Sequence, residues 1–323
     1  LDIFNKNYYT DDLTDYEVHW SLSADGIRVK KGVLPLGSVL PRQHKTVRID
    51  GLCDALDSGK DYRLDVSFKL KADKPWAKAG YVQADQQLEL HRAITRPSLA
   101  STMDKSLQPL KVMQQESKIT VTGNGNTIVF DKSTGSLHSL VYGGKTIIAA
   151  GNGPKLDAFR AWVNNDNWAY QAWYENGLHN LQHKALDCKW VSNRDGSVSL
   201  SFKVESQGLS TAKLEGADKN WKKLVETGKR PDFKFTTNVI YTVYPDGSVE
   251  SQSSITSNKT QLILPRLGYV MKLPADMSMM VYNGRGPIGN YPDRKTAQHI
   301  GIYEQQDMAD EFVNFPKPQD MAN

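Results

Sequence analysis

The chain has 323 residues, of which 39% are hydrophobic and 24% are charged, a globular mixture that excludes wholesale disorder and suffices for two domains. Its formal net charge of +4 is small and the charges are interspersed, which argues against a nucleic-acid partner. Two distant cysteines exclude a disulfide framework, and no apolar run approaches the roughly 18 residues of a membrane span. Residues 1–7 contain neither an initiator methionine nor a signal peptide, so we expect a piece of a longer protein.

Alternating apolar and polar residues predict β-strands in the first part of the chain. Apolar side chains stand at every second position in residues 16–22 and 64–70, as in strands with one buried face. The pair Asp25-Gly26 marks a tight turn after the first of these strands. We therefore expect residues 1–92 to form an antiparallel β-sandwich.

The alternation breaks over residues 93–117, which contain two prolines and several Ser and Thr residues. Such a composition is typical of an extended linker, and we expect one there. Strand patterns resume in residues 198–204 and 235–243, with Gly-containing turn signals beside them. Residues 118–323 are therefore predicted to form a second, larger β domain.

Two segments of the second domain depart from the strand pattern. Residues 175–184 carry leucines three residues apart, and we expect one helix there with both leucines facing inward. Residues 213–230 are polar and rich in lysine. We expect a surface excursion there, with a short helix running from Asp218 toward Thr227.

The densest unusual feature is the aromatic segment, residues 159–174, with the sequence FRAWVNNDNWAYQAWY. It contains three of the seven tryptophans, and amide and acid side chains lie among them. Flat aromatic faces stack on the apolar face of a sugar ring, and Asn and Asp side chains match its hydroxyl groups. The segment favours a carbohydrate-facing loop, against an alternative in which its tryptophans close the end of a sandwich core.

Two other motifs predict no site. His179 and His183 have the i, i+4 spacing of zinc ligands, but Asn180 stands where the H-E-x-x-H motif has its glutamate, so no metal site is expected. Residues 284–289 spell G-x-G-x-x-G, the pattern of a dinucleotide-binding loop. Pro287 removes one of the N–H groups that would hold the phosphates, so no such loop is expected.

The chain shows no convincing pair of catalytic carboxylates. A retaining glycosidase needs two carboxyl groups held roughly 5–5.5 Å apart on firm elements. Asp157, Asp166 and Glu175 lie in or near the aromatic segment, but nothing in their spacing pairs them. We therefore expect no catalytic residue in this chain.

Two signatures and several longer stretches point to a known family. Residues 159–166 read FRAWVNND and residues 282–295 read YNGRGPIGNYPDRK, close to the signatures R-A-P-x-D-N-D and G-R-G-P-x-E-N-Y-x-D-R. Residues 3–26, 64–80 and 130–145 add to the likeness. On these residues the sequence resembles the C-terminal part of the large bacterial β-galactosidases of glycoside hydrolase family 2.

The match to the signatures is incomplete. Trp162 and Asn164 replace a proline and an aspartate of the first signature, and Gly289 replaces a glutamate of the second. Near the end, residues 317–323, KPQDMAN, resemble the family's R-P-Q-E-N-G-N with four departures. These differences bear on substrate preference rather than on fold. Arg160, Asn165 and Asp166 match the first signature.

The resemblance implies an all-β fold with two different sandwiches. Residues 1–92 would form the immunoglobulin-like β-sandwich that follows the catalytic barrel, and residues 93–117 the linker. Residues 118–323 would form a large antiparallel super-sandwich similar to galactose mutarotases, truncated at its C-terminus.

The resemblance also implies where the chain meets a sugar. In the family, the loop after the first signature lies near the sugar pocket, so Asn167 and Trp168 would be substrate-binding residues. Arg160, Asn165 and Asp166 would form the scaffold of the site, with an ion pair between Arg160 and Asp166 holding the turn.

By the same resemblance, the two catalytic glutamates belong to a barrel that would precede Leu1. The chain alone is therefore expected to be inactive and to hold no cofactor, and a divalent metal would belong to the barrel. The expected partners are β-galactoside sugars, that barrel and further copies of the protein, without nucleic acid or membrane. The parent enzyme would be bacterial, in the cytoplasm or the periplasm.

Two alternatives remain open. One is a stand-alone carbohydrate-binding module. The other is an enzyme similar to aldose-1-epimerases, which would need a histidine and an acid as paired catalytic groups on one sheet face. His138 and His299 are the candidates for that histidine.

Overall fold

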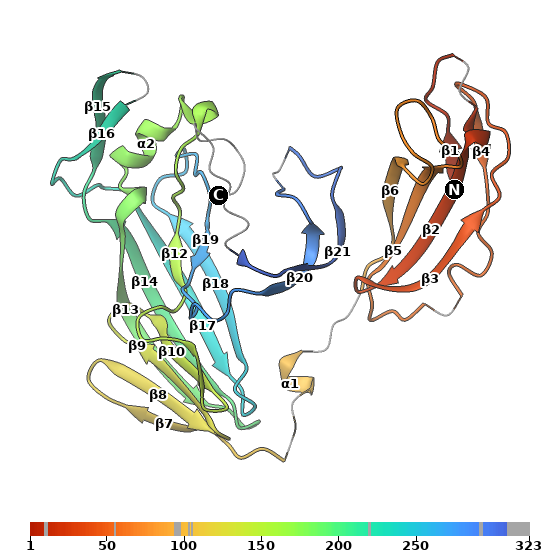
Figure 1. Cartoon of the computed structure of the whole chain (residues 1–323). Helices are drawn as coiled ribbons and strands as arrows, with labels where there is room; N and C mark the ends of the chain where they lie inside the picture. Colours follow the sequence, from red (N-terminus) through yellow and green to blue (C-terminus); the bar gives the residue numbers. More distant parts are fainter. Residues whose placement is uncertain are drawn as a thin grey trace. The chain divides into compact units, whose positions relative to one another are not determined.

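The computed structural model describes residues 1–9, 12–54, 56–93, 98–102, 104, 106–218, 221–290 and 293–308. The KPQDMAN stretch at residues 317–323 lies outside the described residues. The chain divides into two compact units (Figure 1). The first combines Leu1–Arg96 with Met279–Met308, and the second is built from Pro97–Ser278.

The first unit is an antiparallel sandwich with one complete sheet. Strands β3-β2-β5-β6 form this sheet in that order, and β1 pairs with β4 in a two-stranded second layer. The alternation expected for residues 16–22 and 64–70 is confirmed, because Val18, Leu22 and Leu64 are almost completely buried. The elements of this part are β1 (Asp2–Phe4), a 3-10 turn (Leu13–Asp15), β2 (Tyr16–Ala24), β3 (Ile27–Leu34), β4 (His44–Thr46), β5 (Tyr62–Leu70) and β6 (Val82–His91).

A hairpin from late in the sequence, β20 (Met280–Gly286) and β21 (His299–Gln305), completes the first unit. The amide of Gln87 on β6 donates to the Ile300 carbonyl and accepts from the Ile300 N–H, both at 2.8 Å. Asn283 donates to the Asp25 carbonyl at 2.9 Å. A hairpin that the sequence assigns to the second domain therefore groups with the first unit.

The second unit packs two antiparallel sheets face to face. One has the strand order β11-β10-β9-β8-β7 and the other β13-β14-β17-β18. Apolar side chains from both sheets, among them Phe130, Leu200 and Val243, fill the space between them. The prediction of an all-β, antiparallel, sandwich-like fold is thus confirmed. The strands of the two sheets are β7 (Lys111–Gln114), β8 (Lys118–Gly123), β9 (Asn126–Asp131), β10 (Ser136–Tyr142), β11 (Lys145–Ile148), β13 (Leu181–Ser192), β14 (Val198–Gly208), β17 (Lys234–Val243) and β18 (Val249–Ser257).

Several smaller elements accompany these sheets in the chain (Figure 1). They are the helices α1 (Leu99–Thr102) and α2 (Tyr170–Glu175), the 3-10 turns η2 (Asn164–Asp166) and η3 (Leu178–Asn180), and the strands β12 (Lys155–Asp157), β15 (Ala212–Asp218), β16 (Trp221–Glu226) and β19 (Gly268–Val270). Strand β7 lies inside the stretch predicted as linker and pairs with β8. No helix in the described part of the chain is long and apolar enough to cross a membrane.

Two helix predictions are wrong. The helix expected over residues 175–184 does not form. The helix α2 already ends at Glu175, and Gly177, in the left-handed conformation at φ 67°, prevents it from continuing. The following residues form η3 and then β13. The short helix expected from Asp218 toward Thr227 is instead the hairpin β15–β16, in which Leu214 pairs with Leu224. The predicted surface excursion between two strands is present, but as a β-ribbon.

Candidate functional site

The aromatic segment connects β12 to α2 through η2, and its three tryptophans lie in three different environments. Trp173 is 2% exposed and donates its indole N–H to the Ile263 carbonyl at 2.9 Å. Trp162 is half-buried and stacks on Tyr170. Trp168 is 71% exposed. Trp173 is therefore a core residue, as in the alternative in which the tryptophans close the end of a sandwich core, whereas Trp168 faces solvent.

An ion pair between two residues of the first signature fixes the turn before Trp168. Arg160 donates to the Asp166 carboxylate from Nη1 at 2.6 Å and from Nη2 at 2.9 Å. The same carboxylate accepts the Val163 N–H at 2.8 Å, and the Asp166 N–H donates to the Val163 carbonyl at 2.9 Å. Asp166 is buried although it is charged, so both of its oxygens need these donors. The expected ion pair is confirmed.

The remaining predicted site residues lie on the outside of this turn. Asn165 is exposed within η2. Asn167 directly follows η2 in helical conformation and is also exposed, next to Trp168. The ion pair thus stabilises a short turn that presents an amide and an indole together to solvent. Their contact with a sugar stays a prediction.

An open cavity of about 450 Å³ begins beside the aromatic segment. Asp157 on its wall forms a salt bridge with Arg266, whose Nε lies 2.7 Å from the carboxylate. Sequence reasoning missed Arg266, because 109 positions separate the two partners and no local pattern joins them. The lining residues are Gly151, Asn152, Gly153, Lys155, Leu156, Asp157, Phe159, Arg266, Val270, Met271 and Lys272.

The acids near the aromatic segment each have a partner of a different kind. Asp157 is paired with Arg266, and Asp166 is paired with Arg160. Glu175 accepts a hydrogen bond from Gln171 at 3.2 Å on the exposed side of α2. These three carboxylates are therefore arranged as ion-pair and helix-surface groups. None of the hydrogen bonds described for them joins one to another.

The two histidines with zinc-like spacing lie on different elements. His179 on η3 contacts Glu226 at 2.8 Å, and His183 on β13 contacts the Ser206 hydroxyl at 2.9 Å. Burial lowers the pKa of His183, and the nearby Lys155 ammonium lowers it further. Within the described ranges, no group of three or more His, Cys, Asp or Glu side chains is placed to hold a metal ion.

The histidines considered for an epimerase have contrasting surroundings. His138 lies 2.5 Å from the Lys118 ammonium, and burial followed by this charge lowers its pKa. His299 lies between two carboxylates of the first unit, 3.1 Å from Asp65 and 3.8 Å from Asp85. The second histidine therefore lies within 4 Å of two carboxylates, on the face where β21 meets the sandwich, whereas the group that contacts the first is an ammonium.

Residues of the second signature are joined by hydrogen bonds to the backbone of the same segment and do not form a nucleotide-binding loop. Arg285 on β20 donates to the carbonyls of Lys295 and Gln298 at 3.1 and 2.7 Å. Asn290 donates back to the Arg285 carbonyl at 3.0 Å. The first two glycines of the G-x-G-x-x-G run lie within strand β20, and the next element along the chain is β21. Matching signature residues therefore hold the connection between two strands.

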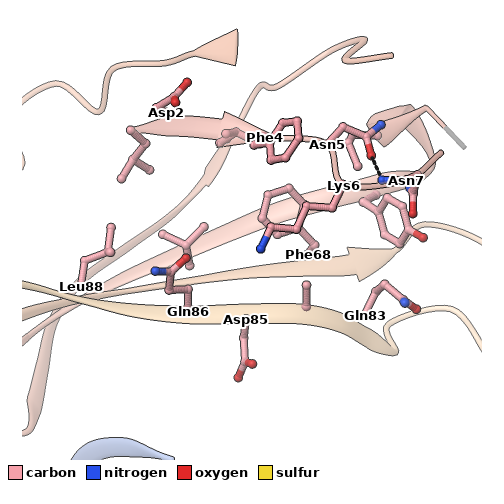
Figure 2. Close-up of a pocket in the computed structure, with 16 residues that line it drawn as sticks. Asp2, Phe4, Asn5, Lys6, Asn7, Phe68, Gln83, Asp85, Gln86 and Leu88 are labelled. Carbon is pink, nitrogen blue, oxygen red and sulfur yellow. Dashed lines mark hydrogen bonds between the residues drawn. The ribbon is translucent and has the colours of Figure 1, made fainter. Parts of the chain in front are cut away.

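The first unit carries a separate groove of about 400 Å³ beside β1 and β6 (Figure 2). Phe4, Phe68 and Leu88 are among its apolar walls. At one end Asn5 is buried, donating to the Val39 carbonyl at 2.8 Å and accepting the Asn7 N–H at 3.0 Å. The buried amide is thus satisfied by the chain itself, and no residue predicted from the sequence to bind sugar lines this groove.

Comparison with known families agrees with the family indicated by the two signatures. Residues 122–323 match the family model described as the beta galactosidase small chain. Residues 1–91 match the model described as beta-galactosidase, domain 4. The resemblance inferred from the two signatures is confirmed.

Individual relatives extend the likeness over nearly the whole chain. A beta-galactosidase of Priestia megaterium is 25% identical over 99% of this chain, and one of Halalkalibacterium halodurans is 26% identical over 99%. A beta-galactosidase of Psychromonas ingrahamii is 27% identical over 92%. The chain spans 28%, 29% and 27% of the lengths of these three relatives.

Proposed function

The chain belongs to the beta galactosidase small chain family, and we propose that it is the non-catalytic part of an enzyme that hydrolyses terminal β-galactosides. In this proposal, a catalytic barrel outside the chain supplies the two carboxyl groups of the reaction. The two sandwiches support that barrel, and the turn that carries Asn167 and Trp168 lines one side of the sugar pocket. The partners are β-galactosides, the barrel and further copies of the protein.

One observation carries this proposal: Trp168 is exposed on a turn that the Arg160–Asp166 ion pair holds in place. An exposed indole contributes little to a core, but its flat face can stack on the C–H face of a galactose ring. Because the turn is already ordered, little conformational entropy is lost when the ring meets a ligand. The adjacent Asn167 has an amide side chain, a type of group that pairs with sugar hydroxyls.

The charges near the aromatic segment support a non-catalytic role. Asp157 and Asp166 are each engaged by an arginine, and Asp166 also accepts the Val163 N–H. A catalytic carboxyl group of a glycosidase instead has to face the scissile bond, with a second carboxyl group roughly 5–5.5 Å away. These two acids are therefore suited to fixing the backbone.

A stand-alone carbohydrate-binding module is the second candidate, favoured by the same exposed Trp168. The two functions differ in what the chain does alone. Titration of the chain with galactose and lactose, followed by tryptophan fluorescence, gives saturable binding for a module. For a part that only lines a pocket completed by the barrel, we expect no saturation at millimolar sugar. An anomer-interconversion assay in the same samples tests the epimerase alternative with His299.

The non-catalytic role is tested by activity of the purified chain on a chromogenic β-galactoside. We expect the buffer rate from the chain and rapid hydrolysis from the enzyme that contains it. Turnover that persists after repurification and disappears in Asp166→Ala or Glu175→Gln would contradict the proposal.

A further inference from the structure

The hairpin β15–β16 contacts the aromatic segment through one lysine. The Lys222 ammonium lies 4.9 Å from the centre of the Tyr170 ring and 5.9 Å from the centre of the Trp162 ring. It also donates a hydrogen bond to the Tyr170 hydroxyl. A cation within about 6 Å of a ring centre is attracted by the electron-rich face of the ring. One ammonium group therefore interacts with two aromatic residues at once.

These two aromatic residues stand on either side of the turn that presents Trp168. Trp162 precedes η2 and Tyr170 begins α2, and their rings stack at 4.6 Å with an angle of 22° between their planes. The stack therefore joins the two ends of the turn. The Arg160–Asp166 pair closes the same turn from within, so Lys222 acts at a second, separate point.

The position of Lys222 on its strand explains why this lysine, and not its neighbour, contacts the aromatic stack. Successive residues of a strand point to opposite faces, so the next residue, Lys223, faces away from the aromatic stack and is exposed. No salt bridge joins Lys222 to a carboxylate of the described residues. Among the described residues, the aromatic stack and the Tyr170 hydroxyl are the groups that contact this ammonium.

We propose that Lys222 is a positioning residue for the sugar contact at Trp168. Its charge holds the Trp162–Tyr170 stack together, and the stack fixes both ends of the turn on which Trp168 and Asn167 stand. The hairpin β15–β16 thereby sets the orientation of the indole toward the galactose ring. This inference rests on the proposed function, because it assumes that Trp168 meets the sugar.

The test compares three variants of the enzyme that contains this chain. Lys222→Met keeps the length of the side chain but removes its charge, Lys222→Arg keeps a cation, and Lys223→Met removes the neighbouring charge as the matched control. We expect Lys222→Met to lower kcat/KM by about 3- to 20-fold, the range of a single cation–π contact. Lys222→Arg should recover most of this loss, and Lys223→Met should equal the wild type.

A second measurement on the chain itself does not depend on any sugar. The stacked Trp162–Tyr170 pair should give a near-ultraviolet circular dichroism band that weakens in Lys222→Met and persists in Lys222→Arg and Lys223→Met. Labelling with 5-fluorotryptophan should show a shifted or broadened Trp168 resonance in Lys222→Met alone. An unchanged band and resonance in Lys222→Met would overturn the positioning role.

Failure of this inference can be told apart from failure of the proposed function. If Trp168→Ala impairs kcat/KM but Lys222→Met does not, the positioning role is wrong and the sugar contact stands. If Trp168→Ala has no effect either, the proposed sugar contact is wrong, and the positioning role for it falls as well. A fall in Tm for Lys222→Met with unchanged kcat/KM would assign Lys222 to stability only.

Discussion

Arg160 and Asp166 lie six positions apart and form a two-pronged ion pair, with N–O distances of 2.6 and 2.9 Å. The pair is largely sheltered from water, with 23% of the arginine side chain and 12% of the aspartate side chain exposed. Two parallel hydrogen bonds fix both distance and orientation, because the guanidinium group is planar. The turn between the two residues is therefore held in one geometry before any ligand arrives.

Removal of the arginine should destabilise the second unit. In Arg160→Met the Asp166 carboxylate stays buried without its cation, which typically costs about 3–5 kcal/mol, less where water can enter. At about 2–4 °C per kcal/mol for a unit of this size, we expect Tm to fall by several degrees. Calorimetry of the chain measures this, with the exposed Arg230→Met as control. Equal Tm values for the two variants would show that the pair contributes nothing to stability.

Trp173→Ala should destabilise the chain without changing its surface. Trp173 stands on α2, and its indole is 2% exposed, packs in a buried apolar cluster, and donates to the Ile263 carbonyl. Loss of a buried aromatic ring costs roughly 3–5 kcal/mol, and the carbonyl also loses its donor. Urea unfolding at neutral pH gives the free energy of unfolding. A loss below about 1 kcal/mol would mean that this tryptophan does not support the core.

The all-β class and the main strands could be predicted from the sequence because burial of one sheet face imposes a period of two, as in β14 and β17. The Arg160–Asp166 pair could also be anticipated, since both partners belong to the signature that the chain shares with the family. The composition of the aromatic segment did not show that Trp168 is exposed while Trp173 is buried, because composition does not tell which way each side chain points. Lys222 and Arg266 were missed for a different reason: each contacts residues 52 or more positions away, which only tertiary packing decides.

Acidification should destabilise the second unit through His183. Burial, and then the Lys155 charge, lower the pKa of His183 below its usual 6.5, so the folded state prefers the neutral ring. Stability from this group is therefore complete above about pH 6.5 and is lost as the pH falls toward the folded pKa. Urea unfolding at pH 7.5 and 5.0 should show a smaller pH-dependent loss in His183→Gln than in the wild type. An identical loss in both proteins would exclude His183 as the cause.

Gln87→Leu should loosen the hairpin β20–β21 from the sandwich of the first unit. The Gln87 amide makes two hydrogen bonds to the Ile300 backbone, one in each direction, as a neighbouring strand would. Leucine makes neither, so the Ile300 N–H loses its acceptor. We expect hydrogen exchange at Ile300 to accelerate at least about 10-fold, with little change in β2 and β5. Unchanged exchange at Ile300 would mean that other contacts hold the hairpin.

The central claim, that Trp168 meets the sugar, is tested most directly by kcat/KM and Tm of Trp168→Ala, measured on one preparation of the enzyme that contains this chain. Loss of an aromatic platform of roughly 1–3 kcal/mol predicts a fall in kcat/KM of about 10- to 100-fold, with Tm nearly unchanged. The control is Trp76→Ala, which removes a 58% exposed indole of the first unit and should leave kcat/KM intact. An unchanged kcat/KM in Trp168→Ala, with or without a lower Tm, would contradict the account.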